Sequence, residues 1–230
     1  MQIVDYRKFR LRKLNTPEFK HLKLLIFWPI FGIIFMALER IFSPEFHPVY
    51  SHIDDVIPFC EWFVIPYYFW FVFLVGIQIY GVLFDVPCFE RYMKFTILTY
   101  TATILVYIIY PTSQNLRPEF FERDNIFTKI VSMLYNFDTN TNVCPSMHVI
   151  GSFAVYFSAR KSKLFGSLWW RIAFFVMTVL ICASTVFLKQ HSVIDIFWGV
   201  VVCIVFYPIV FYEKKNQVLV EKKEEQALPV

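Results

Sequence analysis

Two short stretches decide the fold expected of this sequence: Cys144-Pro145-Ser146-Met147-His148 and His191-Ser192-Val193-Ile194-Asp195. Each stands at the edge of an apolar segment long enough to cross a bilayer. Ionisable side chains at membrane depth are costly unless they have partners, so they mark functional sites. We therefore expect the rest of the chain to bring both stretches, together with Arg117, to one face of a membrane.

The composition is that of an integral membrane protein. The 230 residues are 57% hydrophobic and 20% aromatic, and only 17% are charged, against about 25% in an average soluble domain. The charges cluster between apolar runs, and no soluble domain of useful size remains once those runs are removed. The net charge of +4 comes from short flanking segments, so it does not indicate a nucleic-acid partner.

Six apolar runs predict six transmembrane helices, because a span needs about 20 mostly apolar residues. They are Leu24–Leu38, Ile65–Phe84, Phe95–Tyr110, Ser146–Ala159, Leu168–Leu188 and Ile194–Tyr212. The predicted fold is thus an all-α polytopic membrane bundle over residues 24–212. A basic segment, residues 1–23, precedes it, and a charged tail, residues 213–230, follows. The basic segment is interpreted as a topogenic flank in preference to an interfacial helix.

The connections between the spans are expected to be loops, with one exception. Glu39–Asp55 is rich in proline, histidine and acid and predicts a solvated loop, and Asp85–Lys94 predicts a short loop. Between spans three and four, residues 119–143 carry apolar side chains at helical spacing, with Asp124 as a candidate cap. These are Ile126, Phe127, Ile130, Val131, Leu134 and Tyr135. The helix either packs on the bundle or is interfacial, lying at the lipid surface beside the site.

The distribution of lysine and arginine predicts the orientation. The N-terminus, the loop between spans four and five and the tail are basic, whereas the loop after span one is acidic. Since cytoplasmic loops carry an excess of Lys and Arg, both termini of this multi-pass chain are expected in the cytoplasm beneath a cell membrane. Arg117, Ser146, His148 and His191 then share the outer face.

The residue types at this face suit phosphoryl transfer. His191 and Asp195 are four residues apart, so on a helix they share one face, and the carboxylate can fix the ring tautomer. His148 lies just inside a helix expected to begin at Pro145, and a helix N-terminus binds phosphate. One histidine can attack phosphorus while the other protonates the leaving alkoxide.

Further donors complete the expected site. Ser146 supplies a hydroxyl and Arg117 a bidentate fork suited to phosphate oxygens. A zinc site is the alternative use of His148, His191 and Asp195, since three protein ligands suffice for a catalytic metal. No fourth pattern supports zinc, so neither a metal nor another cofactor is predicted.

Three segments resemble the signature motifs of the type-2 phosphatidic acid phosphatase superfamily, which includes membrane lipid phosphatases and related phosphotransferases. The first family motif, Lys-x6-Arg-Pro, matches at Arg117-Pro118, with Tyr110 at the lysine position. The second, Pro-Ser-Gly-His, is present with Met147 in place of glycine. The third, Ser-Arg-x5-His-x3-Asp, ends at His191 and Asp195. The resemblance covers about residues 60–212.

The resemblance implies roles for these residues. His191 would be the nucleophile that forms a phosphohistidine, Asp195 its orienting carboxylate, and His148 the general acid and later the base. The phosphate would be held by Arg117, Ser146 and backbone N–H groups near Met147. The family needs no metal, and its substrates are membrane lipid phosphates.

Two departures from the family pattern leave the reaction open. Tyr110 and Thr185 replace an expected lysine and arginine, which resembles the branch typified by inositol phosphorylceramide synthase. Lys189 could restore part of this charge, or it could extend to the headgroups. A lipid phosphatase, a phosphotransferase acting on an acceptor alcohol, and a non-enzymatic lipid-phosphate binding or transport protein are the three hypotheses. The intact His148, His191 and Asp195 argue against the last.

Overall fold

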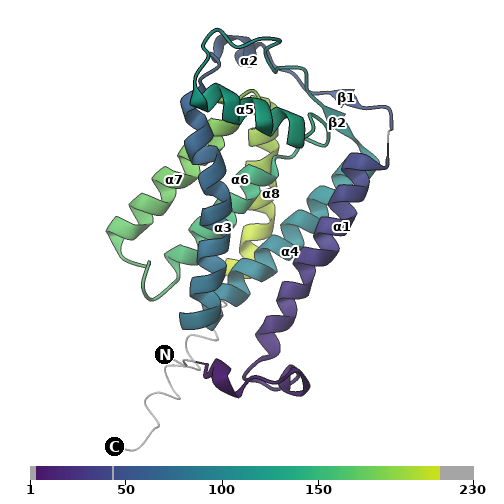
Figure 1. Ribbon diagram of the computed structural model, residues 1–230. Helices are drawn as coiled ribbons and strands as arrows, with labels where there is room; N and C mark the ends of the chain where they lie inside the picture. Colours follow the sequence, from purple (N-terminus) through teal and green to yellow (C-terminus); the bar gives the residue numbers. More distant parts are fainter. Residues whose placement is uncertain (1–3, 43, 213–230) are drawn as a thin grey trace, which may run out of the picture.

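The computed structural model describes residues 4–42 and 44–212, and in these the chain is almost entirely helical (Figure 1). Six helices run back and forth between two ends of a bundle: α1 (Phe27–Arg40), α3 (Val64–Phe84), α4 (Val86–Ile109), α6 (Met147–Arg160), α7 (Leu168–Phe187) and α8 (Val193–Phe211). One end, here called the site end, carries α2 (His52–Val56), α5 (Ile126–Phe137), β1 (His47–Pro48) and β2 (Thr112–Ser113). The opposite end, here called the basal end, carries the N-terminal turns.

Within residues 4–42 and 44–212, five helical segments are long and apolar enough to cross a membrane: Lys20–Arg40, Glu61–Phe84, Val86–Ile109, Leu168–Phe187 and Val193–Phe211. The first joins the 3-10 helix η3 (Lys20–Ile26) to α1, and the second joins η4 (Glu61–Phe63) to α3. These segments confirm the predicted all-α polytopic membrane protein. Six crossings stay a prediction, because α6 has only 14 residues.

The short helix α6 is the centre of the bundle. It packs against α3, α4, α7 and α8, and its apolar residues Val149, Ile150, Ala154 and Val155 are fully buried. Such a helix is largely enclosed by protein, and its apolar character reflects core packing more than contact with lipid. Its first turn carries His148, whose ring lies 4.6 and 4.4 Å between centroids from the rings of Tyr67 and Trp70 on α3.

The predicted loop Asp85–Lys94 is wrong, because α4 begins directly after α3. The Asp85 side chain accepts the backbone N–H of Cys88 at 3.1 Å and so caps the new helix. The close approach of the two helices requires Gly81, where a Cβ would lie 2.8 Å from the Cβ of Phe89. The third long helix therefore starts about two and a half turns earlier than its apolar run suggests.

The predicted helix between spans three and four is present as α5, lying across the site end (Figure 1). Its cap is Asn125 and not Asp124, since the Asn125 Oδ1 accepts the N–H groups of Phe127 and Thr128 at 2.9 and 3.0 Å. Val131 and Leu134 are buried against a cluster from α3 and the end of α7. The helix thus packs on the bundle, and its position at the lipid surface stays a prediction.

The basic N-terminal segment folds against the basal end. It forms short 3-10 turns, η1 (Tyr6–Lys8) and η2 (Leu11–Lys13), in place of one continuous interfacial helix. Phe19 and His21 are buried, and the Tyr6 hydroxyl donates to the carbonyl of Val82 at 2.6 Å. This segment is consequently part of the folded bundle and more than a flank. The predicted charged tail, residues 213–230, lies outside the described residues.

Candidate active site

The two predicted histidines meet at the site end of the bundle. His148 lies in the first turn of α6, and His191 lies in the short connection between α7 and α8. Their ring centroids are 5.5 Å apart and the rings are inclined at 68°. A group as small as a phosphoryl group can contact both rings at this separation.

His191 is held by Asp195, as the four-residue spacing predicts. The His191 Nδ1 lies 3.1 Å from the Asp195 Oδ2, and Asp195 is fully buried. The same oxygen accepts the N–H of Ser192 at 2.9 Å, and the Ser192 hydroxyl accepts the N–H of Ile194, so these residues form the capping box of α8. Because Nδ1 faces the carboxylate, Nε2 is the ring nitrogen free to react.

The start of α6 is joined to the start of α8. The N–H of Ser146 donates to the carbonyl of Asp195 at 3.1 Å, and α8 approaches closely because Gly199 has no Cβ to meet Ser146 and Val149. The helix begins at Met147 with Ser146 as its cap, two residues later than the predicted start. The first-turn amides have no partner within the helix. The Ser146 hydroxyl is fully buried and has no hydrogen-bond partner in the part of the chain that the structure describes.

Arg117 lies at the site, but most of its guanidinium is bonded to the end of α5. Nη1 donates to the carbonyl of Tyr135 at 3.1 Å, while Nη2 donates to the carbonyls of Asp138 and Thr139 and to the Gln190 side chain at 3.0, 2.8 and 2.7 Å. Only the buried Nε has no partner among the described residues. In this arrangement Arg117 fastens α5 to the loop before His191 and does not present a fork to a phosphate.

Lys189 points away from His191. Its Nζ donates to the carbonyls of Asp54 and Ile57 at 2.6 and 2.5 Å, and its backbone φ is +53°. The ammonium group therefore neutralises the C-terminal end of α2, a favourable position for a cation. The prediction that Lys189 replaces a lost phosphate-binding cation has no support in this arrangement.

The two positions that depart from the family pattern have other partners. Tyr110, at the end of α4, is exposed and stacks on His47 with ring centroids 4.1 Å apart. Thr185 is fully buried in α7, and its carbonyl accepts the N–H groups of Gln190 and His191 at 2.9 and 3.1 Å. Thr185 thus shapes the loop that carries His191.

Asp54 is a site residue that the sequence interpretation missed. The predicted solvated loop is wrong at this position, because Asp54 is only 2% exposed. Its Oδ2 accepts the Ser192 hydroxyl at 2.6 Å and the Ser51 N–H at 2.8 Å, and its Oδ1 accepts the Val193 N–H at 2.9 Å. The signal was a Ser-x-x-Asp capping box at residues 51–54, the same pattern as at residues 192–195.

Asp138 is a second missed carboxyl group, at the end of α5. Its Oδ2 accepts the Tyr67 hydroxyl at 3.1 Å, and the Tyr67 ring lies 4.6 Å from the His148 ring between centroids. Burial raises the pKa of Asp138, and the hydrogen bond from Tyr67 and the nearby Arg117 guanidinium oppose this shift. No sequence pattern singles out Asp138, since it lies in a long connection.

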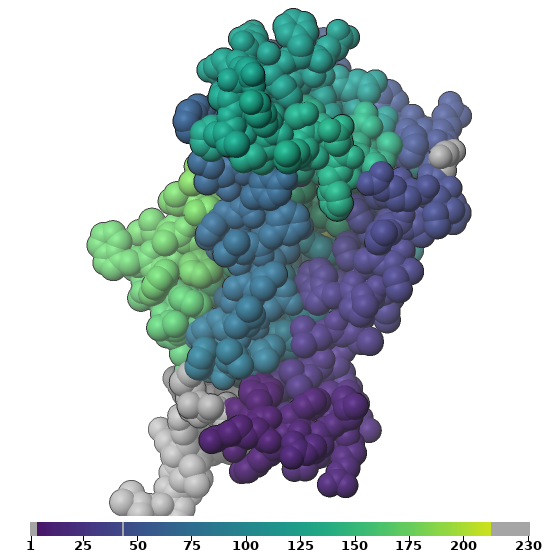
Figure 2. Space-filling model, in the orientation of Figure 1, coloured from purple at the N-terminus to yellow at the C-terminus, as the bar shows by residue number. Residues whose placement is uncertain are grey.

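A cavity of about 850 Å³ reaches the site between α1 and α3, beneath α5, where Figure 2 shows the surface hollowed. Met147, His148 and Asp138 line its site end, whereas His191 and Asp195 do not line it. In residues 4–42 and 44–212, no group of three or more His, Cys, Asp or Glu side chains is arranged to hold a metal ion.

Comparison with known proteins gives a match to a family profile. The family profile described as the PAP2 superfamily matches residues 91–218, a range that contains Arg117, His148, His191 and Asp195. No curated protein and no solved structure matches the chain. Since the matched range covers more than half of the 230 residues, this chain belongs to the PAP2 superfamily, the type-2 phosphatidic acid phosphatases that its motifs resemble.

Proposed function

We propose that this protein is an integral membrane phosphatase that hydrolyses a lipid phosphate or diphosphate through a phosphohistidine at His191. Membership of the superfamily supports a phosphatase-type enzyme in general. The observation that carries the finer proposal is the pairing of His191 with buried Asp195 beside His148. One histidine oriented by a carboxylate and a second without one are the parts that a covalent phosphoryl transfer needs.

In the first half of the reaction, His191 Nε2 attacks phosphorus. The N–P bond forms as the P–O bond to the lipid breaks, and protonated His148 gives its proton to the leaving oxygen. The buried Asp195 stabilises the positive charge that develops on His191. The first-turn amides of α6, which have no partner within the helix, and the unpartnered Ser146 hydroxyl would donate to the equatorial oxygens.

The second half of the reaction reverses these roles. Neutral His148 takes a proton from water as the water oxygen attacks phosphorus. The N–P bond then breaks, and His191 returns to its neutral state while inorganic phosphate leaves. None of these steps uses a metal ion, so turnover should persist in the presence of a chelator.

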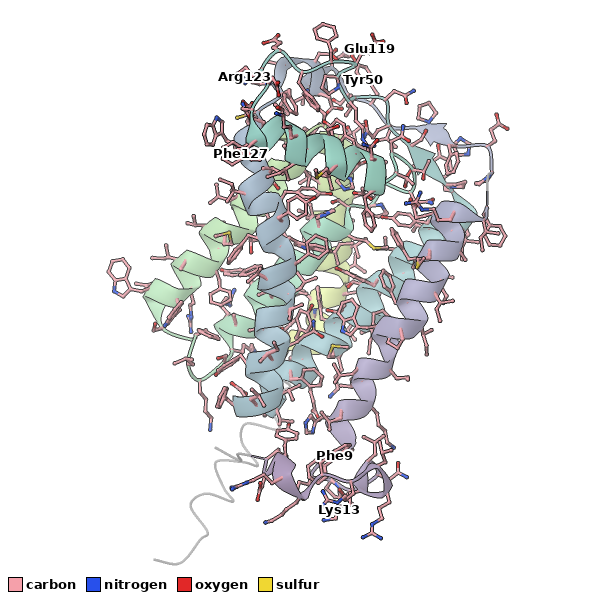
Figure 3. The ribbon with its side chains drawn as sticks, viewed as in Figure 1. Phe9, Lys13, Tyr50, Glu119, Arg123 and Phe127 are labelled. Atoms are coloured by element: carbon pink, nitrogen blue, oxygen red, sulfur yellow. The ribbon has the colours of Figure 1, made fainter. Side chains whose placement is uncertain are left out.

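We also propose that the site end faces outward and that the basal end is cytoplasmic. The basal end carries the N-terminal basic segment, and Figure 3 places Phe9 and Lys13 there, opposite Tyr50, Glu119 and Arg123. The excess of lysine and arginine at cytoplasmic ends supports this orientation. Both termini would then be cytoplasmic, which requires an even number of crossings, such as the predicted six.

A phosphotransferase of the inositol phosphorylceramide synthase type is the second candidate. Tyr110 and Thr185 replace two cations of the family pattern, and the Arg117 fork is bonded to backbone carbonyls. A site with fewer free cations suits a phosphodiester, which carries less negative charge than a monoester. This candidate would pass the phosphoryl headgroup to an acceptor alcohol.

The test uses purified protein in detergent with EDTA and a panel of lipid phosphates, diphosphates and phosphodiesters, with and without an acceptor alcohol. His191→Ala is the test variant, and His52→Ala, an exposed histidine at the same end, is the matched control. Free phosphate that is lost only in His191→Ala supports the phosphatase. A new phosphodiester without free phosphate supports the transferase. If neither free phosphate nor a new phosphodiester forms, the binding or transport protein is favoured. Full activity in His191→Ala refutes the covalent mechanism.

A further inference from the structure

A second cavity, here called the basal cavity, lies at the basal end of the bundle, opposite the two histidines. Its volume is about 790 Å³, within the range of small-molecule sites. It lies between the N-terminal segment, the junction of α3 and α4, and the turn that joins α6 to α7 (Figure 1). Its lining includes charged side chains of both signs: Glu18, Lys20, Asp85, Glu90 and Lys163.

The walls of the basal cavity are held together by hydrogen bonds between distant parts of the chain. The Tyr6 hydroxyl donates to the carbonyl of Val82 at 2.6 Å and lies 2.9 Å from the His21 Nε2, which joins the N-terminal segment to α3. The N–H of Lys163 donates to the Asp85 Oδ2 at 3.2 Å, which joins the turn after α6 to the start of α4. The cavity is therefore preformed, and a ligand would not have to order its walls.

The basal cavity lies at a boundary between membrane and water. Within the described ranges, three helical segments long and apolar enough to cross a membrane begin or end at lining residues: Lys20–Arg40, Glu61–Phe84 and Val86–Ile109. This is the level of the phospholipid headgroups. The Phe84 side chain, which also lines the cavity, is 48% exposed beside the charged groups. A ligand with a charged headgroup and hydrocarbon chains fits this position.

The charged side chains of the basal cavity leave two cations and one carboxylate without a charged partner. Lys20, Lys163 and Glu18 are exposed and form no ion pair with any residue that the structure describes. The two oxygens of Asp85 accept the backbone N–H groups of Cys88 and Lys163 at 3.1 and 3.2 Å. Asp85 therefore bonds to the backbone and does not pair with either lysine.

These groups define the chemistry of a ligand. Lysine ammonium groups are common partners of phosphate oxygens. The Glu18 carboxylate accepts hydrogen bonds, so it suits a primary ammonium group, whereas a quaternary ammonium group has no N–H to donate. Quaternary groups are recognised by cages of aromatic rings. Phe84 is the only phenylalanine, tyrosine or tryptophan among the described residues that line the cavity.

We propose that the basal cavity binds the headgroup of a membrane phospholipid in which a phosphodiester is joined to a primary ammonium group, as in phosphatidylethanolamine. Lys20 and Lys163 hold the phosphodiester, Glu18 accepts the ammonium group, and the hydrocarbon chains lie along Phe84. The lipid is a ligand and not a substrate, because the histidines lie at the other end of the bundle. By joining the N-terminal segment to the turn after α6, it stabilises the folded protein.

The experiment measures the thermal unfolding of the full-length protein in detergent as lipid is added, which gives an apparent Kd. Phosphatidylethanolamine is compared with phosphatidylcholine, which has no ammonium N–H, and with phosphatidylglycerol, which has no ammonium group; all three carry the same chains. The salt concentration is about 0.15 M, which screens exposed charges outside the cavity. Phosphoethanolamine, the water-soluble headgroup, is the fourth ligand.

The expected order of binding follows from the proposed contacts. The Kd of phosphatidylethanolamine should be about fivefold lower than that of either other phospholipid, the effect of one exposed ion pair. Phosphoethanolamine should bind more weakly than the lipid, because it has no chains to place beside Phe84.

Two lysines on η3 make a matched pair of variants. Lys20 lines the basal cavity, whereas Lys23 is exposed and does not line it. Lys20→Gln should raise the Kd of phosphatidylethanolamine about fivefold, and Lys163→Gln should do the same. Lys23→Gln should leave this Kd unchanged. Glu18→Gln should remove the preference for phosphatidylethanolamine over phosphatidylglycerol, and its unfolding temperature without lipid should stay that of the wild type.

Three results would overturn the proposal. The first is an equal Kd for the three phospholipids, and the second is an equal effect of Lys20→Gln and Lys23→Gln. The third is phosphoethanolamine binding as tightly as the lipid, which would identify a water-soluble ligand. Since unfolding and not turnover is measured, none of these results bears on the proposed phosphatase, and loss of the phosphatase proposal would leave this one standing.

Discussion

Replacing Asp54 by alanine is expected to destabilise the protein and to disturb His191. The buried carboxylate accepts three hydrogen bonds, from the Ser51 N–H, the Ser192 hydroxyl and the Val193 N–H, at 2.8, 2.6 and 2.9 Å. It also lies at the N-termini of α2 and α8, where a negative charge is favourable. Alanine removes every acceptor and leaves three donors without a partner.

The magnitude follows from these donors. A buried donor without a partner costs about 1–3 kcal/mol, so three of them cost about 3 kcal/mol at the low end. For a chain of this length, about 1 kcal/mol shifts the unfolding temperature by about 2–4 °C, so a fall of at least about 6 °C is expected. Because Ser192 adjoins His191, the imidazole should lose its orientation, and kcat should fall more than KM rises.

The assay measures thermal unfolding in detergent together with kcat and KM on a lipid phosphate. Asp55→Ala is the matched control, since Asp55 is the neighbouring carboxylate and is exposed. The unfolding temperature and kcat of Asp54→Asn should lie between those of the two alanine variants. Asparagine keeps one acceptor oxygen but directs an NH₂ group at a donor. Equal unfolding temperatures and equal kcat values for Asp54→Ala and Asp55→Ala would refute the reasoning.

Three further predictions concern neighbouring groups. Arg117→Lys cannot reproduce the planar donors that hold the end of α5, so the unfolding temperature should fall by roughly the cost of one or two hydrogen bonds, about 1–3 kcal/mol; a raised KM at unchanged unfolding temperature would instead show a phosphate ligand. Lys189→Met should destabilise the protein by a similar amount without changing KM, and a selective rise in KM would contradict this. Burial raises the pKa of Asp138 in the folded protein, so its ionisation opposes folding as the pH rises above about 4. Asp138→Asn should therefore unfold at a higher temperature than the wild type at pH 7 but not near pH 3.5. An equal increase at both pH values would contradict a raised pKa of Asp138.

The helices were largely predictable from the apolar runs, because a bilayer imposes both length and composition on a span. The start and end of α7 and α8 differ from the predicted runs by no more than one residue. The contact between His191 and Asp195 was predictable too, since the turn of a helix alone brings residues four apart together.

The wrong predictions share a physical cause: patterns of neighbouring residues do not reveal which distant residues a side chain contacts. The prediction of a loop before α4 is wrong because the charged residues there indicate a loop, whereas Asp85 is the cap of a helix. The sequence around Asp54 indicates a solvated side chain, because its partner Ser192 is 138 residues away. The residue types of Arg117 and Lys189 indicate phosphate binding, but both side chains donate to backbone carbonyls. Every residue has a backbone carbonyl, so no sequence pattern marks such a partner.

The shortness of α6 has a consequence for where the reaction occurs in the bilayer. Its 14 residues extend about 21 Å, while the hydrocarbon core is about 30 Å thick. Under the proposed orientation, with Arg160 and Lys161 at the cytoplasmic interface, the turn that carries His148 would lie about 9 Å inside the outer interface. The proposed reaction would then take place below the level of the headgroups, so a lipid substrate would not have to rise out of the membrane.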